Sequence, residues 1–102
     1  MYYIYMLRCE DNSIYTGIAK DLEHRLNEHF TKDEKCAKYT KSHKAKKLEI
    51  AWKTENKSLA SKLEYAIKKL DKNRKEKLIN TPNLLGEFLK DKIDETQYCI
   101  YK

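Results

Sequence analysis

Glycine and proline are scarce in this sequence, with two glycines and one proline in 102 residues. Because both residues mark the turns of loop-rich all-β folds, their scarcity favours a fold rich in helix. A long apolar run is also missing. The apolar opening, residues 1–7, is far too short to span a bilayer, and no small-residue cleavage site follows it. We therefore expect no membrane segment and interpret this opening as a core strand.

Cysteine is rare as well, and the three examples are Cys9, Cys36 and Cys99. An odd number without a CxxC pair predicts neither a disulfide framework nor a thiolate zinc site. A zinc site built from Cys9, His24 and His29 would lack any recognised spacing. These cysteines favour a reducing compartment, so we expect a cytoplasmic protein.

Acidic residues are fewer than basic ones, 16 against 22, and the formal net charge is +6. Residues 81–102 contain three lysines and four acids, which leaves a net charge of +7 on residues 1–80. Such an excess attracts polyanions. Nucleic acid is the most abundant candidate, and acidic proteins or anionic lipid surfaces respond to the same field. Charge alone does not choose among them.

The first half of the chain predicts a hairpin and a helix. Aromatic and β-branched residues fill residues 2–9 and 14–18, and turn formers separate them, which is typical of a β-hairpin. An amphipathic helix is predicted over residues 21–31. Its apolar stripe consists of Leu22, Leu26 and Phe30. Residues 32–47 are rich in lysine and are expected to form a basic connector.

The second half predicts one more strand and further helix. Residues 48–54 alternate well enough for a third strand, with Leu48, Ile50 and Trp52 on one face. A cap at Asn56 or Ser58 then starts the most secure helix, which we expect to extend through about residue 73. Residues 74–80 predict a short helical segment, and residues 81–83, which include the proline, break it.

The last 19 residues, 84–102, are expected to dock as a helical turn or as an added strand. The fold class predicted from these elements is α+β, with a three-stranded, mainly antiparallel sheet flanked by helices. We assign residues 1–80 to the core domain and residues 81–102 to an extension packed on or beside it.

The hairpin loop decides where two tyrosines point. A three-residue loop over residues 10–12, with a type I turn and Asn12 in the left-handed region, places Tyr5 opposite Gly17. Tyr15 then emerges on the same face as Tyr5, and Gly17 leaves an open notch beside the Tyr5 hydroxyl. A two-residue loop shifts the register by one and puts the tyrosines on opposite faces.

Three further side chains are suited to phosphate chemistry. Arg25 and His29 are four residues apart on the first helix and share a face at the edge of its apolar stripe. A guanidinium in that place can grip a phosphate through paired donors. Glu64 follows a stripe residue of the long helix, where a carboxylate can hold a divalent cation. Phosphodiester hydrolysis needs a cation, an arginine and a base, and the sequence offers a carboxylate to hold the first and candidates for the other two.

These residues occur in the order of a known family. The segments are Tyr3-Ile4-Tyr5, Tyr15-Thr16-Gly17, Arg25 with His29, Ala37-Lys38-Tyr39-Thr40, and Glu64 within residues 63–70. Together they resemble the GIY-YIG nuclease family over residues 2 to about 80, and most of all its small stand-alone bacterial members, the UPF0213-like proteins. Two positions depart from the motifs, because Tyr3 replaces the first glycine and Thr16 replaces the second isoleucine.

The resemblance implies a role for each matched residue. Tyr5 is implied as general base or water orienter, Tyr15 as its hydrogen-bonding neighbour, and Arg25 as the phosphate clamp. Glu64 is implied as the single protein ligand of Mg²⁺ or Mn²⁺, and His29 is similar to the histidine that some members place beside the arginine. A tyrosine base has an ordinary pKa of about 10, so a nearby cation must stabilise its phenolate.

We therefore expect metal-dependent cleavage of DNA phosphodiester bonds. Flapped or branched DNA and RNA stay open as substrates, and selectivity is expected to come from DNA shape or from a protein partner. The nucleic-acid contacts that we expect are Gly17, Lys38, Tyr39, Lys41 and Lys68. One alternative is a non-catalytic nucleic-acid-binding module of the same fold, and another is a basic protein-interaction domain.

Ordinary structural roles remain open for the same residues. Tyrosines in a strand more often pack than catalyse. Glu64 has Lys68 at i+4, which is a common stabilising surface pair. Arg25 has Glu28 and Asp21 within reach on its own helix, and the histidine that follows it by four residues is suited to the helix end.

Overall fold

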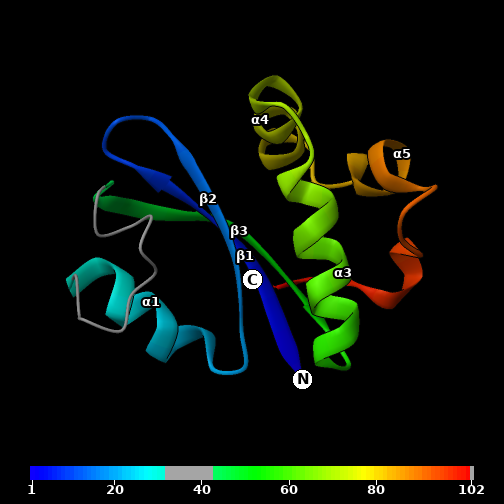
Figure 1. Cartoon of the computed structure of the whole chain (residues 1–102), viewed down its shortest axis with the longest axis horizontal. Helices are drawn as coiled ribbons and strands as arrows, with labels where there is room; N and C mark the ends of the chain where they lie inside the picture. Colours follow the sequence, from blue (N-terminus) through cyan, green and yellow to red (C-terminus); the bar gives the residue numbers. More distant parts are fainter. Residues whose placement is uncertain (32–42, 102) are drawn as a thin grey trace.

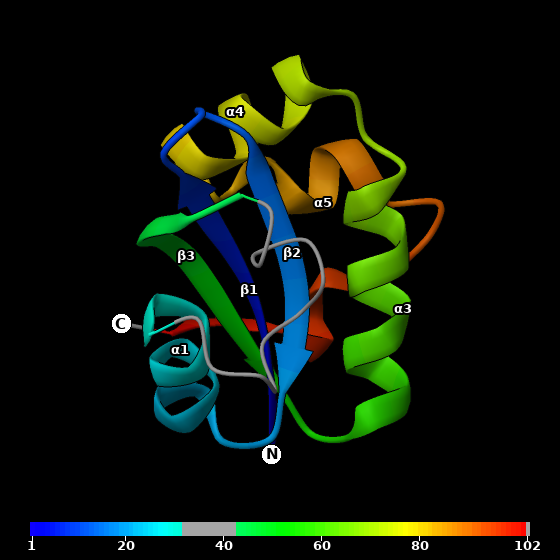
Figure 2. The same ribbon diagram turned by 60° about the vertical axis from the view of Figure 1, so that its left-hand side comes forward.

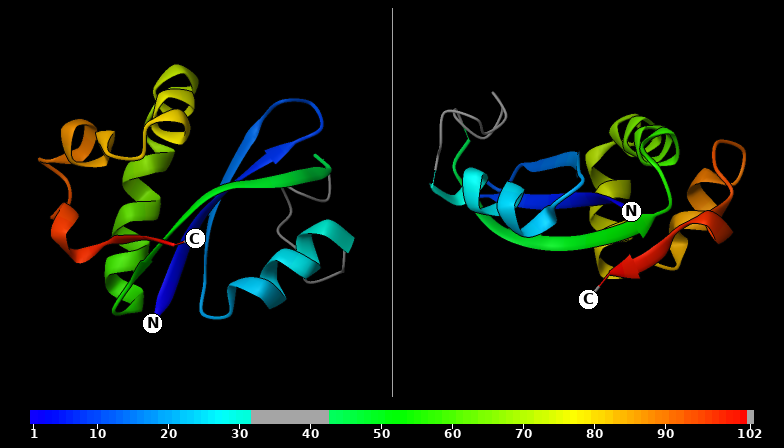
Figure 3. Two further views of the ribbon diagram at one scale, coloured as in Figure 1. Left: turned by 180° about the vertical axis from the view of Figure 1, so that it is seen from behind. Right: turned by 90° about the horizontal axis from the view of Figure 1, so that it is seen from below.

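The computed structural model describes residues 1–31 and 43–101. Its centre is one antiparallel sheet in the order β2-β1-β3-β4. The strands are β1 (Tyr2–Cys9), β2 (Ile14–Ala19), β3 (Ala45–Thr54) and β4 (Cys99–Tyr101). The predicted α+β class is confirmed, but the sheet has four strands where three were predicted. The fourth strand pairs with β3, as Figure 3 shows, because the outer edge of β3 offers unpaired backbone groups to a segment too short to have its own pattern.

Helices cover both faces of this sheet. Helix α1 (Leu22–Thr31) lies on one side, and the other helices lie on the opposite side (Figure 1). They are α3 (Lys57–Lys68), α4 (Lys72–Asn80), α5 (Leu84–Leu89) and the short 3-10 turn η1 (Glu95–Gln97). In the described part of the chain, no helix combines the length and the apolar character needed to cross a bilayer.

Two hydrophobic cores result from the alternation of the strands. Ile4, Met6, Ile50 and Trp52 point toward α3, α4 and α5 and form the larger core. Alternate residues, Tyr5, Leu7 and Ala51, point toward α1 with Leu22 and form the smaller core. The sheet is therefore a central layer between one helix and a group of helices.

The hairpin has the predicted register. Asn12 is left-handed with φ 70°, and the backbone N–H of Cys9 donates to the Ser13 carbonyl at 2.9 Å, which closes a three-residue loop. Tyr5 pairs with Gly17, and Tyr15 pairs with Leu7. Both tyrosines therefore lie on the face that α1 covers.

The predicted limits of β3 and the predicted face of Leu48 are wrong. The strand begins at Ala45, so the last three residues of the expected basic connector belong to the sheet. Leu48 packs in the core under α1, whereas Ile50 packs in the larger core on the other face. The reason is a register shift opposite residues 6 and 7 of β1, which leaves Glu49 without a partner in the ladder and reverses the alternation.

The long helix is shorter than predicted. Asn56 caps α3 by accepting from the backbone N–H of Leu59 at 2.9 Å, as expected, but the helix ends at Lys68 and not near residue 73. Asp71 then accepts from the backbone N–H of Arg74 at 2.8 Å and caps α4. A local cap of this kind starts a new helix direction, which the apolar spacing does not reveal.

The stripe of α1 also differs from the prediction. Phe30 is 39% exposed, while His29 is 0% exposed. The side that faces the sheet thus follows the spacing i, i+4, i+7 through Leu22, Leu26 and His29. An imidazole takes the core position that apolar spacing had given to the phenylalanine.

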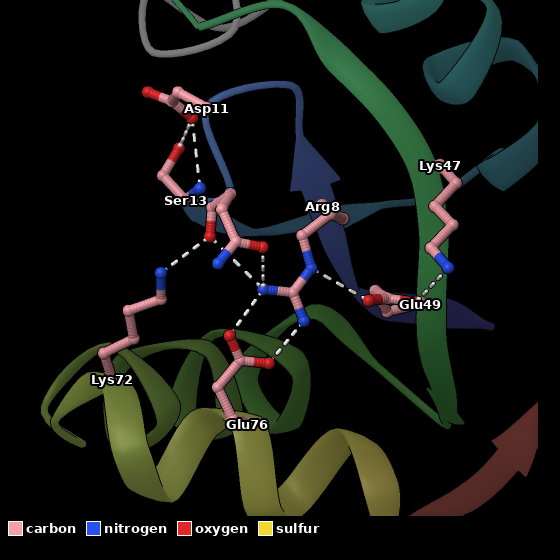
Figure 4. Close-up of polar contacts among 8 residues, drawn as sticks. Arg8, Asp11, Ser13, Lys47, Glu49, Lys72 and Glu76 are labelled. Atoms are coloured by element: carbon pink, nitrogen blue, oxygen red, sulfur yellow. Dashed lines mark hydrogen bonds and ion pairs between the residues drawn. The ribbon is translucent and has the colours of Figure 1, made fainter.

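A polar network joins the hairpin to α4 (Figure 4). Arg8, whose side chain is 12% exposed, donates from Nε to Glu49 at 2.9 Å and forms a two-pronged ion pair with Glu76. Lys72 donates to the Asn12 carbonyl at 2.8 Å. The unpaired position of Glu49 in β3 brings its carboxylate to Arg8, so one cation ties β1, β3 and α4 together.

Candidate active site

The two tyrosines of the hairpin form the floor of the candidate site. Tyr5 is fully buried, Tyr15 is partly buried, and their ring centroids lie 6.2 Å apart. Gly17 lies opposite Tyr5, and a Cβ atom there would lie 2.6 Å from Tyr5 Oη and 2.9 Å from Tyr15 Cε2. Only a glycine hydrogen fits at such distances, so the Tyr5 hydroxyl and the Tyr15 ring fill the notch that was expected to stay open.

His29 reaches the same place from α1. Its Nε2 lies 2.8 Å from the Tyr5 hydroxyl, and its ring centroid lies 5.6 Å from that of Tyr5 and 5.3 Å from that of Tyr15. Burial, together with the positive charge of Arg25, lowers the pKa of His29 to about 4. The imidazole is therefore neutral near pH 7, and with its proton on Nδ1 it accepts the Tyr5 hydroxyl proton at Nε2.

Arg25 lies one helical turn before His29. It donates to Glu28 at 2.9 Å, which is one of the two intrahelical pairings that the sequence left open. Burial and the neighbouring Tyr15 phenol raise the pKa of Tyr5 well above its ordinary value, and Arg25 opposes this rise through a hydrogen bond and its charge. The Arg25 guanidinium thus interacts with the Tyr5 phenol as well as with Glu28 of its own helix.

Glu64 approaches from the third side. Figure 2 shows β2 between α1 and α3, the helix that carries this residue. Burial raises the pKa of Tyr15, and the charge of Glu64 raises it further, while the same carboxylate also raises the pKa of Tyr5. The charge of Glu64 therefore acts on both phenols, although α3 lies on the opposite face of the sheet from α1.

Lys68 completes this side. Its Nζ lies 3.5 Å from Glu64 Oε2, so the i+4 pair expected as an ordinary structural role exists. The same Nζ lies 5.8 Å from the ring centroid of Tyr15. The lysine therefore stands at the rim of the candidate site and not on a remote surface.

The structure brings together most of the predicted site. Tyr5, Tyr15, Arg25, His29 and Glu64 come from four separate elements and meet beside Gly17 and Lys68. The other expected nucleic-acid contacts, Lys38, Tyr39 and Lys41, lie outside the described residues.

The donor set decides which metal would fit. Among residues 1–31 and 43–101, no three histidine, cysteine, aspartate or glutamate side chains form a group that could hold a metal ion. Among the described residues, Glu64 is the carboxylate whose charge acts on both phenols. Magnesium and manganese prefer oxygen ligands, and magnesium commonly binds one or two carboxylates and keeps several waters or phosphate oxygens. Such an ion fits Glu64, whereas zinc would require more ligands from the protein.

One member of the site was not proposed from the sequence. Glu28 is buried, receives the Arg25 guanidinium at 2.9 Å and lies 3.7 Å from His24 Nε2. The spacing of Glu28 and Arg25 was visible in the sequence as a helical pairing. The burial of Glu28 was not visible, because the buried side of the helix was predicted from the apolar stripe of Leu22, Leu26 and Phe30. Glu28 thus holds the Arg25 guanidinium in place.

A family model described as the GIY-YIG catalytic domain matches residues 1–77. This chain belongs to the GIY-YIG family. The match covers every element that contributes to the candidate site of this GIY-YIG protein. It confirms the resemblance drawn from the motifs.

Several relatives are small bacterial proteins. A UPF0213 protein of Fusobacterium nucleatum is 51% identical over 90 residues, which are 88% of this chain and 85% of the relative. A UPF0213 protein of Oceanobacillus iheyensis is 46% identical over 78 residues, with 76% and 88% covered. The solution NMR structure of a UPF0213 protein from Bacillus halodurans matches with a TM-score of 0.51 at 34% identity, covering 78% of this chain and 84% of that one.

Proposed function

We propose that this GIY-YIG protein hydrolyses phosphodiester bonds of DNA with Mg²⁺ or Mn²⁺ held by Glu64. The observation that supports this most is the Tyr5–His29 hydrogen bond of 2.8 Å, which lies within the influence of both Arg25 and Glu64. A buried phenol paired with a neutral imidazole is more than packing requires. A proton acceptor, a guanidinium and a carboxylate at one place are the groups that phosphodiester hydrolysis uses.

In the proposed reaction, the protein transfers a proton without forming a free phenolate. A water molecule attacks phosphorus and gives its proton to Tyr5 Oη, while the Tyr5 proton moves to His29 Nε2. This relay answers the difficulty of a tyrosine base, because burial raises the pKa of Tyr5 and makes a lasting phenolate costly. The leaving oxygen departs on the opposite side and takes a proton from solvent.

The remaining residues bind and orient the phosphate. Arg25, held by Glu28, donates to the phosphate oxygens and balances their developing charge. When bound to Glu64, a divalent cation would polarise the phosphoryl group. The lack of a side chain at Gly17 lets Tyr5 pack against β2 beside Tyr15, and Lys68 contacts the nucleic-acid backbone next to the phosphate. In the proposal, this contact with the nucleic acid extends to Lys38, Tyr39 and Lys41.

The proposed compartment is the reducing cytoplasm, which suits the free thiols of Cys9 and Cys99.

Cleavage assays with matched variants test the proposal. Linear, flapped and branched DNA, and RNA of the same sequences, are incubated with and without Mg²⁺ or Mn²⁺. We expect wild-type cutting that needs the metal, and a loss of about 100-fold or more in Glu64→Ala and in Tyr5→Phe. Glu87→Ala removes an exposed glutamate from α5 and should cut like the wild type. Thermal melting verifies that each variant is folded.

A second function has one observation in its favour. Lys68 already pairs with Glu64 at 3.5 Å and would compete with a cation for the carboxylate. A non-catalytic nucleic-acid-binding module would keep such a pair. Salt-sensitive DNA binding without cutting under every metal condition would establish this module and refute the nuclease, whereas neither binding nor cutting would leave an acidic protein as the partner.

A further inference from the structure

A groove of about 1070 Å³ lies between α3 and α5, and Tyr5 and Tyr15 are not among the residues that line it. Its floor is apolar and includes Phe88 and Leu89 of α5. Its rims carry lysines, among them Lys62 of α3 and Lys92 beyond α5. The segment that includes α5 lies outside the family match, which ends at residue 77, and Glu64 is the lining residue that the groove shares with the candidate active site.

An exposed aromatic ring stands on the rim of the groove. The Tyr65 side chain is 65% exposed, and Lys69 Nζ lies 5.0 Å from its ring centroid. A large ring left in solvent beside a cation is not part of either core. Exposed aromatic rings with flanking lysines are the means by which proteins hold unpaired bases, because each base has a face that stacks and each nucleotide carries a phosphate.

The charges of the groove select an anionic occupant. Lys62, Lys69 and Lys92 line it, and the acid among its lining residues, Glu64, is already paired with Lys68 at 3.5 Å. The surplus is therefore positive. A double helix keeps its bases stacked inside, so only a single strand can offer a base to Tyr65 and phosphates to the lysines together.

The groove also opens at the proposed reaction site. Glu64 and Tyr65 are consecutive residues of α3, and both line the groove. The Glu64 carboxylate acts on both phenols from the other direction. A strand that leaves the phosphate site across α3 therefore enters the groove at once.

We propose that the groove between α3 and α5 holds a single-stranded segment of the nucleic-acid substrate, next to the bond that is cut. One base stacks on Tyr65, and Lys62, Lys69 and Lys92 contact the phosphates of this segment. The inference rests on the proposed nuclease function and gives its substrate class: nucleic acid with a single-stranded flap or overhang at the cleavage point.

The first test measures binding of a fluorescein-labelled oligothymidine by fluorescence anisotropy in EDTA, where no cleavage takes place. Tyr65→Ala should weaken binding about tenfold, within the range known for loss of one base-aromatic stack, and Tyr65→Phe should keep the wild-type affinity. Because the ring is largely exposed, both variants should melt like the wild type.

The second test uses charge. The double variant Lys62→Gln/Lys92→Gln should bind the oligothymidine more weakly, with a salt dependence reduced by about 1.4, since each phosphate contact on a single strand contributes about 0.7. The matched control Lys90→Gln removes an exposed lysine near the same helix that does not line the groove. It should keep the salt dependence of the wild type.

Three outcomes overturn the inference. The first is wild-type oligothymidine affinity in Tyr65→Ala. The second is an equal salt dependence of binding in the double variant and in Lys90→Gln. The third is binding of polyglutamate that is as tight as that of the oligothymidine and is lost in the same variants, which would assign the groove to an acidic protein segment. Cutting of a flapped duplex in Mg²⁺ is measured in parallel. Cutting without Tyr65-dependent binding rejects the groove and keeps the nuclease, and the reverse result rejects the nuclease and keeps the groove.

Discussion

Acid should weaken the fold through one buried histidine. His29 is 0% exposed, and burial lowers its pKa to about 4, against an ordinary value of 6.5. Between these values the unfolded chain takes up a proton that the folded protein excludes. The unfolded state is therefore favoured increasingly as the pH falls below about 6.5, and the loss levels off once the folded histidine also protonates.

The two pKa values give the size of the effect. Each pKa unit corresponds to about 1.4 kcal/mol, so the shift predicts a fall of about 3 kcal/mol in the free energy of unfolding between about pH 7 and pH 4. This is a large part of the stability of a typical small domain. The pKa of Glu76 is lowered by Arg8 and that of Asp94 by Thr96, so both carboxyl groups stabilise the fold at neutral pH. They begin to lose that effect below their ordinary values of 4.5 and 3.8, at or beyond the acid end of this window.

Urea denaturation at a series of pH values measures this loss, and NMR titration of the His29 Cε1 proton measures the pKa itself. His29→Gln removes the titrating ring and should flatten the dependence between about pH 4 and pH 6.5. His24→Gln removes an imidazole that is 68% exposed from the same helix and should keep most of the wild-type loss. A wild-type protein whose stability is flat in this window, or a His29 resonance that titrates near pH 6.5, would refute the reasoning.

Three other substitutions test the packing around the site by urea denaturation. Gly17→Ala should cost about 2 kcal/mol, because the new methyl group lies 2.6 Å from the hydroxyl of fully buried Tyr5. Thr16→Val should stabilise the protein by about 1 kcal/mol, because the buried Thr16 hydroxyl has no hydrogen-bond partner among the described residues. Arg8→Met should lower the free energy of unfolding by about 2 kcal/mol, because it leaves the carboxylates of Glu76 and Glu49 without their shared cation.

Each of these substitutions has a clear contrary result. Wild-type stability in Gly17→Ala would mean that the Tyr5 ring moves freely, and destabilisation in Thr16→Val would mean that the hydroxyl is satisfied. For Arg8→Met, the control is Lys47→Gln, which removes a 3.5 Å ion pair from an exposed lysine and should change stability by less than about 0.5 kcal/mol. Equal effects of these two would make the Arg8 network an ordinary surface feature.

The hairpin shows how much a sequence can specify locally. Its register follows from a three-residue loop and from an asparagine that tolerates φ 70°, so the facing of Tyr5 and Tyr15 was predictable before any tertiary contact was known. The approach of Arg25 and Glu64 was expected from their places at the edges of two apolar stripes. Their actual meeting depends on the packing of α1 and α3 against β2, which no local pattern encodes.

The errors come from interactions that act at a distance or against the pattern. Apolar spacing chose Phe30 for the core, but His29 is placed there by its hydrogen bond to Tyr5. Residues 99–101 were expected as either a helical turn or an added strand, and they form the strand because the edge of β3 is open. The groove with Tyr65 was missed for the same reason, because its second wall comes from a helix distant in sequence.

The irregular ladder of β3 has a consequence for insertions and deletions. Besides Glu49, a second shift leaves Lys46 without a partner opposite β1. Deleting Glu49 would remove the bulge, keep Leu48 opposite Leu7 beneath α1 and strip Arg8 of a counter-ion, whereas deleting Leu48 would place Glu49 opposite Leu7 in that buried layer. The length of this strand is thus under a tighter constraint than its composition, and variants of the fold should accept substitutions here far more readily than a change in spacing.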